Sequence, residues 1–454
     1  MKRVLLSLLW IEGLSIGLSY GQAALVEVSP KNALYHYLES EDASYTWELK
    51  DVIKEGPIVA YDVLLTSQTW QGHVWKHQLT LIVPKKVKRK TALLFIDGGS
   101  VNNEGEPNWR DPRKNDVALA LAGIALENKA ITAVLKQVPM QPLYGGKRED
   151  ALISMTLHNY QQDNDPTWPL LFPMAKSAIR AMDAIQELTA KQLNKQVEDF
   201  VISGASKRGW TTWLTGASKD SRVKAIAPIV IDILNMPANL NYQLEAYAEY
   251  SEEIKDYTDL GIPQAMNSEK GRNIVTMIDP YSYRSVLTMP KMIFIGTNDP
   301  YWVVDGVKHY FDSIPGQNFL HYVPNAGHNL GGGKQAFKAL GAFFGFTAKE
   351  EPYPVTQWKT TVNGQQVSLD INVTPKRLKG VKLWRAYSKD RDFRDETWAS
   401  TDLELPRTAS VSATIPLPAD GYQAFYVDLI YKGPNGKEYS QSTRVFVTSD
   451  KEIL

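Results

Sequence analysis

A serine stands at a point where an apolar strand is expected to turn into a helix. The apolar run 200–202 favours a buried strand, and aromatic and aliphatic residues recur at helical spacing over 208–214. Between them, Gly204 and Ser206 form the G-x-S half of a nucleophile elbow. In such an elbow a tight turn lifts the serine hydroxyl above the edge of a sheet. We therefore expect Ser206 to be a nucleophile.

The full elbow pattern is G-x-S-x-G, and this chain departs from it at the last position. Arg208 stands where the second glycine is expected, and Gly209 follows one residue later. Two roles are open for this arginine: it binds an acidic group of a substrate, or it forms a buried salt bridge that fixes the elbow. For the motif as a whole, the structural alternative is an ordinary turn with a capping serine.

A carboxylate and a histidine follow the serine in the order that this chemistry needs. Asp299 comes just after an apolar strand candidate, and His328 lies in a turn after another. The order serine, aspartate, histidine is that of α/β-hydrolases. Asp299 would orient His328, which would take the proton of Ser206. Two other carboxylates are alternative acids: Asp305 and, more weakly, Asp232.

A glycine-bearing loop after the strand candidate 91–96 completes the expected site. Gly98 and Gly99 let the backbone approach a substrate carbonyl closely, so either can donate an N–H to the oxyanion. The N–H of Lys207 would be the other donor. The alternative is a glycine turn that only closes the strand.

These residues also resemble a known family, the PhoPQ-activated pathogenicity-related proteins (PqaA family). The resemblance begins near Tyr61 and is carried by 165–169, 174–182, 204–213, 279–283, 289–291, 296–302, 323–325 and His328. It implies an α/β-hydrolase fold with a triad of Ser206, Asp299 and His328. The family includes bacterial envelope proteins linked to antimicrobial-peptide resistance and virulence, and a secreted eukaryotic growth repressor. The elbow also resembles that of glucuronoyl esterases, which implies that Lys207 or Arg208 assists the oxyanion.

Composition excludes several classes of function. The 454 residues carry 50 basic and 50 acidic side chains and no long basic run, which argues against nucleic-acid binding and a polybasic membrane patch. The chain has no cysteine, so disulfides and thiolate chemistry are excluded. No H-E-x-x-H motif occurs, so neither a metal nor a cofactor is expected.

The N-terminus has the pattern of an export signal. Two basic residues precede an apolar run over 4–11, and small residues follow near 19–24. We expect residues 1–24 to be a signal peptide and the mature protein to be periplasmic or secreted, with no stable membrane insertion.

Strands alternate with helices over most of the chain, which favours a mostly parallel sheet covered on both faces. Strands are expected at 61–66, 77–83, 91–96, 131–138, 198–203, 223–231, 291–296 and 319–323, and helices at 115–127, 171–192, 207–217, 305–313 and 334–345. We assign 25–349 to an α/β-hydrolase domain with a helical cap at 235–285. Period-two alternation in 350–454 predicts a β-sandwich of immunoglobulin or fibronectin type. Its expected role is packing or the binding of a glycan or protein.

The expected function is that of an exported serine hydrolase acting on a small-molecule ester or a peptide. Arg208, Trp302 and Trp168 are candidate substrate-binding residues, with core packing as the alternative for the tryptophans. A carboxylesterase and a dipeptidyl-type peptidase are the enzymatic readings. A catalytically silent binding or signalling protein on the same fold is the alternative from another class.

Overall fold

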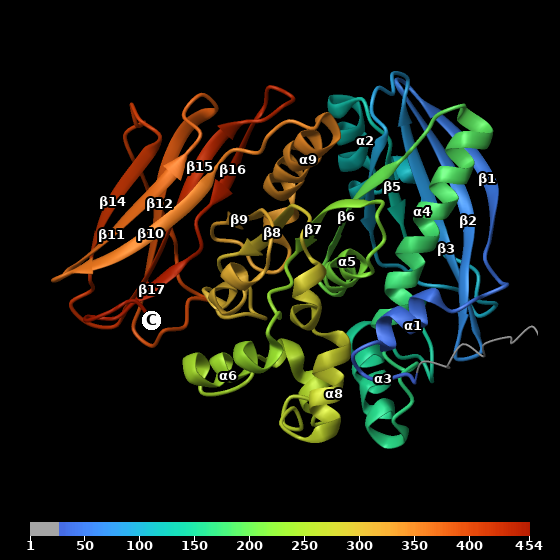
Figure 1. Cartoon of the computed structure of the whole chain (residues 1–454), viewed down its shortest axis with the longest axis horizontal. Helices are drawn as coiled ribbons and strands as arrows, with labels where there is room; N and C mark the ends of the chain where they lie inside the picture. The colour runs from blue at the N-terminus through green and yellow to red at the C-terminus, as the bar shows by residue number, and fades with distance from the viewer. Residues whose placement is uncertain (1–26) are drawn as a thin grey trace, which may run out of the picture.

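The computed structural model describes residues 27–454, so the predicted signal peptide lies outside the described residues. A long mixed sheet runs through the molecule (Figure 1). Its first nine strands lie in the order β1-β2-β3-β5-β4-β6-β7-β8-β9. Their bounds are β1 (Thr46–Glu55), β2 (Ile58–Trp70), β3 (His73–Pro84), β4 (Thr91–Ile96), β5 (Thr132–Leu135), β6 (Asp199–Ala205), β7 (Val223–Ile229), β8 (Lys291–Gly296) and β9 (Asn318–Val323).

The strands divide into an antiparallel edge and a parallel centre. Strands β1, β2 and β3 form an antiparallel ribbon, and β3 pairs antiparallel with β5. The pairs from β5 and β4 through to β9 are all parallel. Strands β4 and β8 are buried at every residue, as expected for a parallel sheet with both faces covered. The predicted α/β-hydrolase fold is confirmed.

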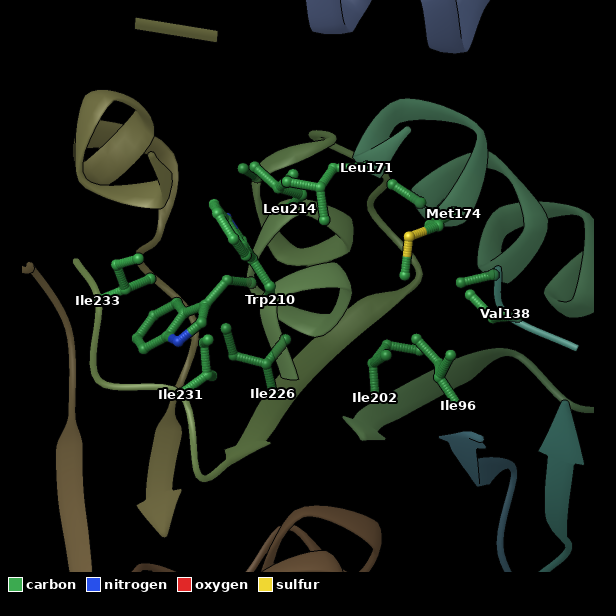
Figure 2. Packing of buried hydrophobic residues seen from close by; sticks show 14 of the residues in the cluster. Ile96, Val138, Leu171, Met174, Ile202, Trp210, Leu214, Ile226, Ile231 and Ile233 are labelled. Atoms are coloured by element: carbon green, nitrogen blue, oxygen red, sulfur yellow. The ribbon is translucent and has the colours of Figure 1, made fainter. Parts of the chain in front are cut away.

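Helices cover both faces of the sheet. On one face α4 (Leu171–Leu193) packs against α5 (Lys207–Ala217), and on the other α2 (Asp116–Asn128) packs against α9 (Lys334–Lys349). Figure 2 shows the first core, where Leu214 of α5 lies beside Leu171 of α4. This packing fixes the start of α5, which follows Ser206 directly. Among the described helices, none is both long and apolar enough to cross a membrane.

The structure differs from the sequence-based scheme at several elements. The helix expected over 305–313 is instead two short 3-10 helices, Gly306–His309 and Phe311–Ser313. Asp305 stands at the position that would cap the first of them, but its carboxylate binds Tyr242 and Lys308. The scheme also lacked α1 (Ala33–Glu39), β1 and α3 (Glu149–Asp163).

A helical segment connects β7 to β8 and corresponds to the expected cap, 235–285. It contains α6 (Met236–Tyr247), α7 (Lys255–Thr258), α8 (Glu269–Ile278) and the 3-10 helices Glu252–Ile254 and Pro280–Val286. Both α7 and α8 contact α3, and α3, α6 and α8 lie at the lower edge of the molecule in Figure 1.

The residues after α9 form two antiparallel sheets. The strands are β10 (Thr356–Asn363), β11 (Gln366–Val373), β12 (Leu378–Ser388), β13 (Ala399–Asp402), β14 (Ser410–Pro416), β15 (Tyr422–Lys432), β16 (Glu438–Ser442) and β17 (Phe446–Thr448). Strands β10, β11 and β14 make one sheet, and the other strands make the second. Both contribute to one hydrophobic core, so the predicted sandwich is confirmed. Its second sheet continues the central sheet, because β16 pairs with β9 at Ser442 and Leu320.

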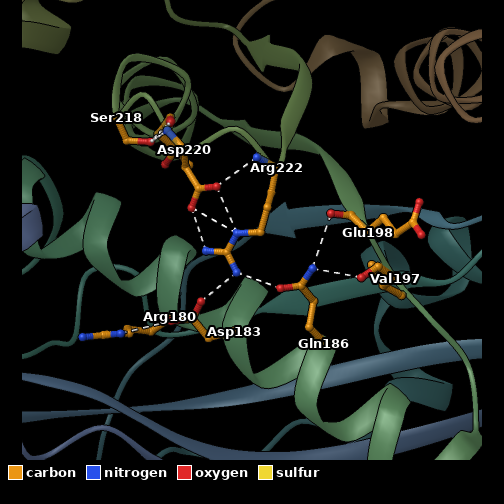
Figure 3. A network of polar contacts seen from close by, with 9 residues as sticks. Arg180, Asp183, Gln186, Val197, Glu198, Ser218, Asp220 and Arg222 are labelled. Atoms are coloured by element: carbon orange, nitrogen blue, oxygen red, sulfur yellow. Dashed lines mark hydrogen bonds and ion pairs between the residues drawn. The ribbon is translucent and has the colours of Figure 1, made fainter.

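A polar network ties α4 to the amino ends of β6 and β7 (Figure 3). Arg222 Nη1 donates to Asp183 Oδ1 (2.7 Å) and to Gln186 Oε1 (2.9 Å). Gln186 Nε2 in turn donates to the carbonyl of Val197 (2.9 Å). This network stabilises the amino ends of β6 and β7, and Ser206 follows the carboxyl end of β6.

Candidate active site

Ser206 lies in a strained turn between β6 and α5. Its φ of 59° and ψ of −128° are values that residues with a side chain rarely adopt. Its N–H donates to the carbonyl of Ile229 at the end of β7 (2.8 Å). This is the backbone geometry expected of a nucleophile elbow, held in place by the neighbouring strand.

Two glycines allow the elbow to close. A Cβ atom on Gly204 would lie 2.7 Å from the carbonyl oxygen of Arg208, and one on Gly209 would lie 2.7 Å from the carbonyl oxygen of Ile229. Both distances are shorter than real Cβ contacts. Because Gly209 makes the close approach to the strand, the usual glycine position is free to hold Arg208.

The guanidinium group of Arg208 is held in a bidentate ion pair. Its Nη1 and Nη2 each lie 2.7 Å from a carboxylate oxygen of Glu149 at the start of α3. The Arg208 side chain is only 11% exposed. It crosses Gly98, where a Cβ atom would lie 2.7 Å from Nη2. This is the geometry of the second role that we expected for Arg208, a buried salt bridge that fixes the elbow.

The pKa of Glu149 reflects these neighbours. Burial raises the pKa of the carboxyl group, but the hydrogen bonds and charge of Arg208 and the charge of Lys207 outweigh it and bring the pKa to about 2. Glu149 also accepts a hydrogen bond from Gln141, which donates to the carbonyl of Gly99 (3.0 Å). The ion pair is therefore connected to the expected oxyanion loop.

The ammonium group of Lys207 lies between two carboxylates. Its Nζ is 3.1 Å from Glu149 Oε2 and 3.0 Å from Asp150 Oδ2. Asp150 Oδ1 accepts a hydrogen bond from the hydroxyl of Tyr257 in the cap (3.0 Å). Lys207 and Arg208 are thus matched by two acidic side chains, and the formal charges at the elbow cancel.

Asp299 and His328 lie together beyond the ends of β8 and β9. His328 Nδ1 is 2.8 Å from Asp299 Oδ2 and 3.1 Å from Oδ1. The Asp299 carboxylate also accepts a hydrogen bond from the N–H of Tyr301 (3.0 Å). The Tyr301 ring packs on the His328 ring, with centroids 4.2 Å apart. His328 Nε2 is buried and has no hydrogen-bond partner among the described residues.

A narrow cavity of about 40 Å³ opens beside Ser206. Ser206 and Lys207 line it, and so does Tyr301, which covers His328. The other lining residues are mostly apolar: Asp150, Leu157, Trp210, Ile231, Ile233, Met236, Leu240, Ile254, Tyr257, Ile262, Pro263, Met266 and Trp302. No hydrogen bond joins Ser206 Oγ to His328 within residues 27–454. Such contacts commonly tighten only when a substrate binds.

Of the other expected site residues, some lie at the cavity and others do not. Trp302 lines the cavity, whereas Arg208 and Trp168 do not. Trp168 packs against Trp70 and donates its Nε1 proton to an aspartate outside the cavity. The N–H of Gly98 donates to the side chain of Asp97 (2.8 Å), so it is already engaged.

The alternative acids have other partners. Asp305 accepts hydrogen bonds from Tyr242 (2.9 Å) and Lys308 (2.9 Å). Asp232 is buried beyond the end of β7, and burial raises its pKa to about 7. In the described part of the chain neither is hydrogen-bonded to His328, and no three His, Asp or Glu side chains are placed to hold a metal ion.

Sequence reasoning missed three residues of this site. Tyr301 stands two residues after Asp299, so its proximity to the acid was a usable signal. Glu149 and Tyr257 carried no such signal, because each reaches the elbow region from a segment distant in sequence.

Several solved structures are similar to this chain at low sequence identity. An acetyl xylan esterase from Paenibacillus sp. R4 is 14% identical, with a TM-score of 0.46 over 69% of this chain and 92% of that chain. An S-formylglutathione hydrolase from Agrobacterium tumefaciens is 11% identical, with a TM-score of 0.45 over 66% of this chain and 99% of that chain.

Sequence comparison gives the family. Autocrine proliferation repressor protein A of Dictyostelium discoideum is 32% identical over 431 residues, which cover 87% of this chain and 85% of that protein. The family model of the PhoPQ-activated pathogenicity-related proteins matches residues 34–394. The chain therefore belongs to the family of PhoPQ-activated pathogenicity-related proteins.

Proposed function

We propose that the protein is a serine hydrolase that cleaves uncharged esters through an acyl-enzyme intermediate. One observation carries the proposal: the strained Ser206 lines the same cavity as Tyr301, which packs on the Asp299-bound ring of His328. Ser206, Asp299 and His328 come from the ends of different strands, and within residues 27–454 His328 Nε2 has no hydrogen-bond partner.

The reaction begins with attack of Ser206 Oγ on the substrate carbonyl while His328 Nε2 takes the hydroxyl proton. Asp299 keeps the Nδ1 proton in place and stabilises the imidazolium. The proton that Nε2 took from Ser206 then passes to the departing alcohol. The carbonyl re-forms, and the acyl group is left bound to Ser206. Water attacks the acyl-serine in the same way and frees the acid and Ser206.

The oxyanion would accept hydrogen bonds from the N–H groups of Lys207 and Gly99. Lys207 is the first residue of α5, where unpaired backbone N–H groups and the helix dipole favour a negative charge. We choose Gly99 over Gly98 because the Gly98 N–H is bonded to Asp97. Each such donor is worth about 3 kcal/mol in the transition state.

The cavity favours an uncharged acyl group. Its mostly apolar walls disfavour a charged group, whose burial without a partner is costly. A dipeptidyl peptidase needs free carboxylates to bind the amino terminus of its substrate, but Glu149 and Asp150 are paired with Lys207 and Arg208. The geometry therefore supports an esterase better than a dipeptidyl peptidase.

We also propose that the protein is exported to the periplasm or the cell exterior. This proposal depends on the sequence of residues 1–24 alone. Any part in virulence or peptide resistance would follow from the substrate that the esterase removes there.

The decisive experiment compares Ser206→Ala with the wild-type protein. A fluorophosphonate probe should label the wild-type protein at Ser206, and p-nitrophenyl acetate should be hydrolysed. Ser206→Ala should lose both and keep its thermal midpoint. Ser218→Ala, at the far end of α5, serves as the matched control and should keep both.

Three outcomes decide between the candidate functions. No labelling and no turnover by the wild-type protein would indicate a silent binding protein. Labelling that persists in Ser206→Ala would assign the nucleophile elsewhere. Faster turnover of aminoacyl amides than of esters would favour the peptidase.

A further inference from the structure

A loop of the C-terminal domain reaches the segment that carries Asp299. This loop, residues 391–398, connects β12 to β13 and is called the clamp loop below. The Nδ2 group of Asn298 faces three of its carbonyl oxygens, those of Phe393 (3.2 Å), Arg394 (3.2 Å) and Glu396 (2.7 Å). Because Asn298 directly precedes Asp299, these contacts act on the backbone that carries the carboxylate.

The clamp loop also holds the segment that carries His328. Asn325 donates from Nδ2 to the carbonyl of Trp398 (3.0 Å), and its Oδ1 accepts from the N–H of the same residue (2.8 Å). The Asn325 side chain thus binds both the N–H and the carbonyl group of Trp398, and Asn325 lies three residues before His328. The histidine segment is therefore fixed to the same loop as the acid.

Thr297 joins the two segments to each other. Its hydroxyl donates to Asn298 Oδ1 (2.7 Å) and accepts from the N–H of Asn325 (2.9 Å). The Asn298 side chain is thereby oriented toward the clamp loop, and the backbone of Asn325 is tied to the segment that carries Asp299.

Packing against β15, on the side of the second sheet that faces away from the sandwich core, holds the clamp loop in place. Phe393 and Trp398 are each only 2% exposed. The Trp398 ring packs on Tyr426 of β15, with centroids 5.5 Å apart. Arg394 closes the loop on itself through an ion pair with Asp392. The C-terminal domain therefore supplies a fixed surface to which two otherwise irregular segments are bonded.

We propose that the C-terminal domain is a positioning element of the active site, with Asn298 and Asn325 as the positioning residues. The inference rests on the proposed esterase function. Asp299 and His328 lie on segments outside the sheet, where a displacement of about 1 Å lowers a catalytic rate about a hundredfold. The clamp loop removes that freedom. It does not line the substrate cavity, so its effect falls on turnover and not on binding.

The test measures kcat and KM for p-nitrophenyl acetate in Asn298→Ala and Asn325→Ala. In each, kcat should fall at least about tenfold while KM stays within about twofold of the wild-type value. Fluorophosphonate labelling of Ser206 should slow in parallel. The matched control is Asn318→Ala, which loses two bonds to the carbonyls of Phe311 and Ile314 at the opposite end of β9.

All variants are measured well below their thermal midpoints, so that loss of folded protein does not contribute. Asn318→Ala should lose a similar amount of stability and keep its kcat. If Asn298→Ala does not fold, Asn325→Ala alone carries the same expectation. Unchanged kcat in the folded Asn variants, with Ser206-dependent turnover in the wild-type protein, overturns this inference alone. Absence of Ser206-dependent turnover in the wild-type protein overturns the proposed function and this inference together.

Discussion

Glu149 is the acidic centre of the elbow, since it binds the side chains of both Lys207 and Arg208. Its own φ of 52° lies in the left-handed region, so the start of α3 adopts an unfavourable backbone conformation to make these contacts. Stability of the elbow is therefore linked to the charge of one carboxyl group.

This linkage predicts a specific pH dependence. The pKa of Glu149 is about 2 in the folded protein, against an ordinary value of 4.5. A carboxyl group with a lowered pKa stabilises the fold above its unfolded pKa, and this contribution disappears as the pH falls toward the folded pKa. The free energy of unfolding of wild type and Glu149→Gln should therefore differ above pH 4.5 and converge toward pH 2.

Urea unfolding of both proteins across this pH range checks the prediction. Glu198→Gln is the control, because Glu198 forms an exposed pair with Lys90 that should contribute little. A Glu149→Gln effect that does not change with pH would mean that the ion pair is not the source of the stability.

The placement of Ser206, Asp299 and His328 at strand ends was predictable from sequence, whereas their neighbours were not. Ser206, Asp299 and His328 each follow a short apolar strand, and strand ends are visible as local patterns. Glu149 and Tyr257 act through contacts with segments far away in the chain. Only the folded structure shows that Arg208, which stands at the usual glycine position, forms an ion pair with Glu149.

Among the elements, the helical segment between β7 and β8 supplies much of the lining of the cavity beside Ser206. Leu240 of α6 lines the cavity, whereas Leu244, one turn later, is 39% exposed. These two leucines are a matched pair on one helix. Leu240→Ala should enlarge the cavity, so the preference should shift from acetyl esters toward butyryl and hexanoyl esters.

The shift is measured as the ratio of kcat/KM for butyryl and acetyl p-nitrophenyl esters. One methylene in an apolar pocket is worth about 1–3 kcal/mol, so the ratio should rise at least about tenfold in Leu240→Ala. Leu244→Ala should leave the ratio unchanged. An equal effect of both substitutions would show that the cavity under the cap does not hold the acyl group.

The elements themselves were largely predictable because their apolar periodicity is strong. Strands 91–96 and 291–296 agree with β4 and β8 residue for residue. The helix predicted at 305–313 does not form, because the Asp305 carboxylate that would have capped it is bound by Tyr242 from the cap and by the nearby Lys308. Strand β1 was not predicted, because most of its residues are exposed and its sequence has no clear apolar pattern that would mark a strand.

At the scale of the whole molecule, several contacts cross the predicted domain boundary near residue 350. Strand β16 pairs with β9, and Tyr353 packs against Phe319 and Phe343 with ring centroids 5.1 and 5.3 Å apart. The C-terminal domain also reaches the cap, because Arg391 donates to the hydroxyl of Tyr242 (2.7 Å). The sandwich therefore contacts the sheet, the cap and the segments that carry Asp299 and His328.

This continuity predicts that the two domains unfold together. Calorimetry of the full chain should show one thermal transition. Tryptophan fluorescence and near-ultraviolet circular dichroism should give the same midpoint. A chain ending at residue 349 should lose that transition and Ser206 labelling, because it exposes the apolar side chains of β9 and α9 and removes the clamp loop. Asn318→Ala, with the sandwich intact, should keep one transition at a lower temperature. Two separate transitions, or a truncated chain that folds and labels at the wild-type rate, would show that the hydrolase domain holds Asp299 and His328 in place on its own.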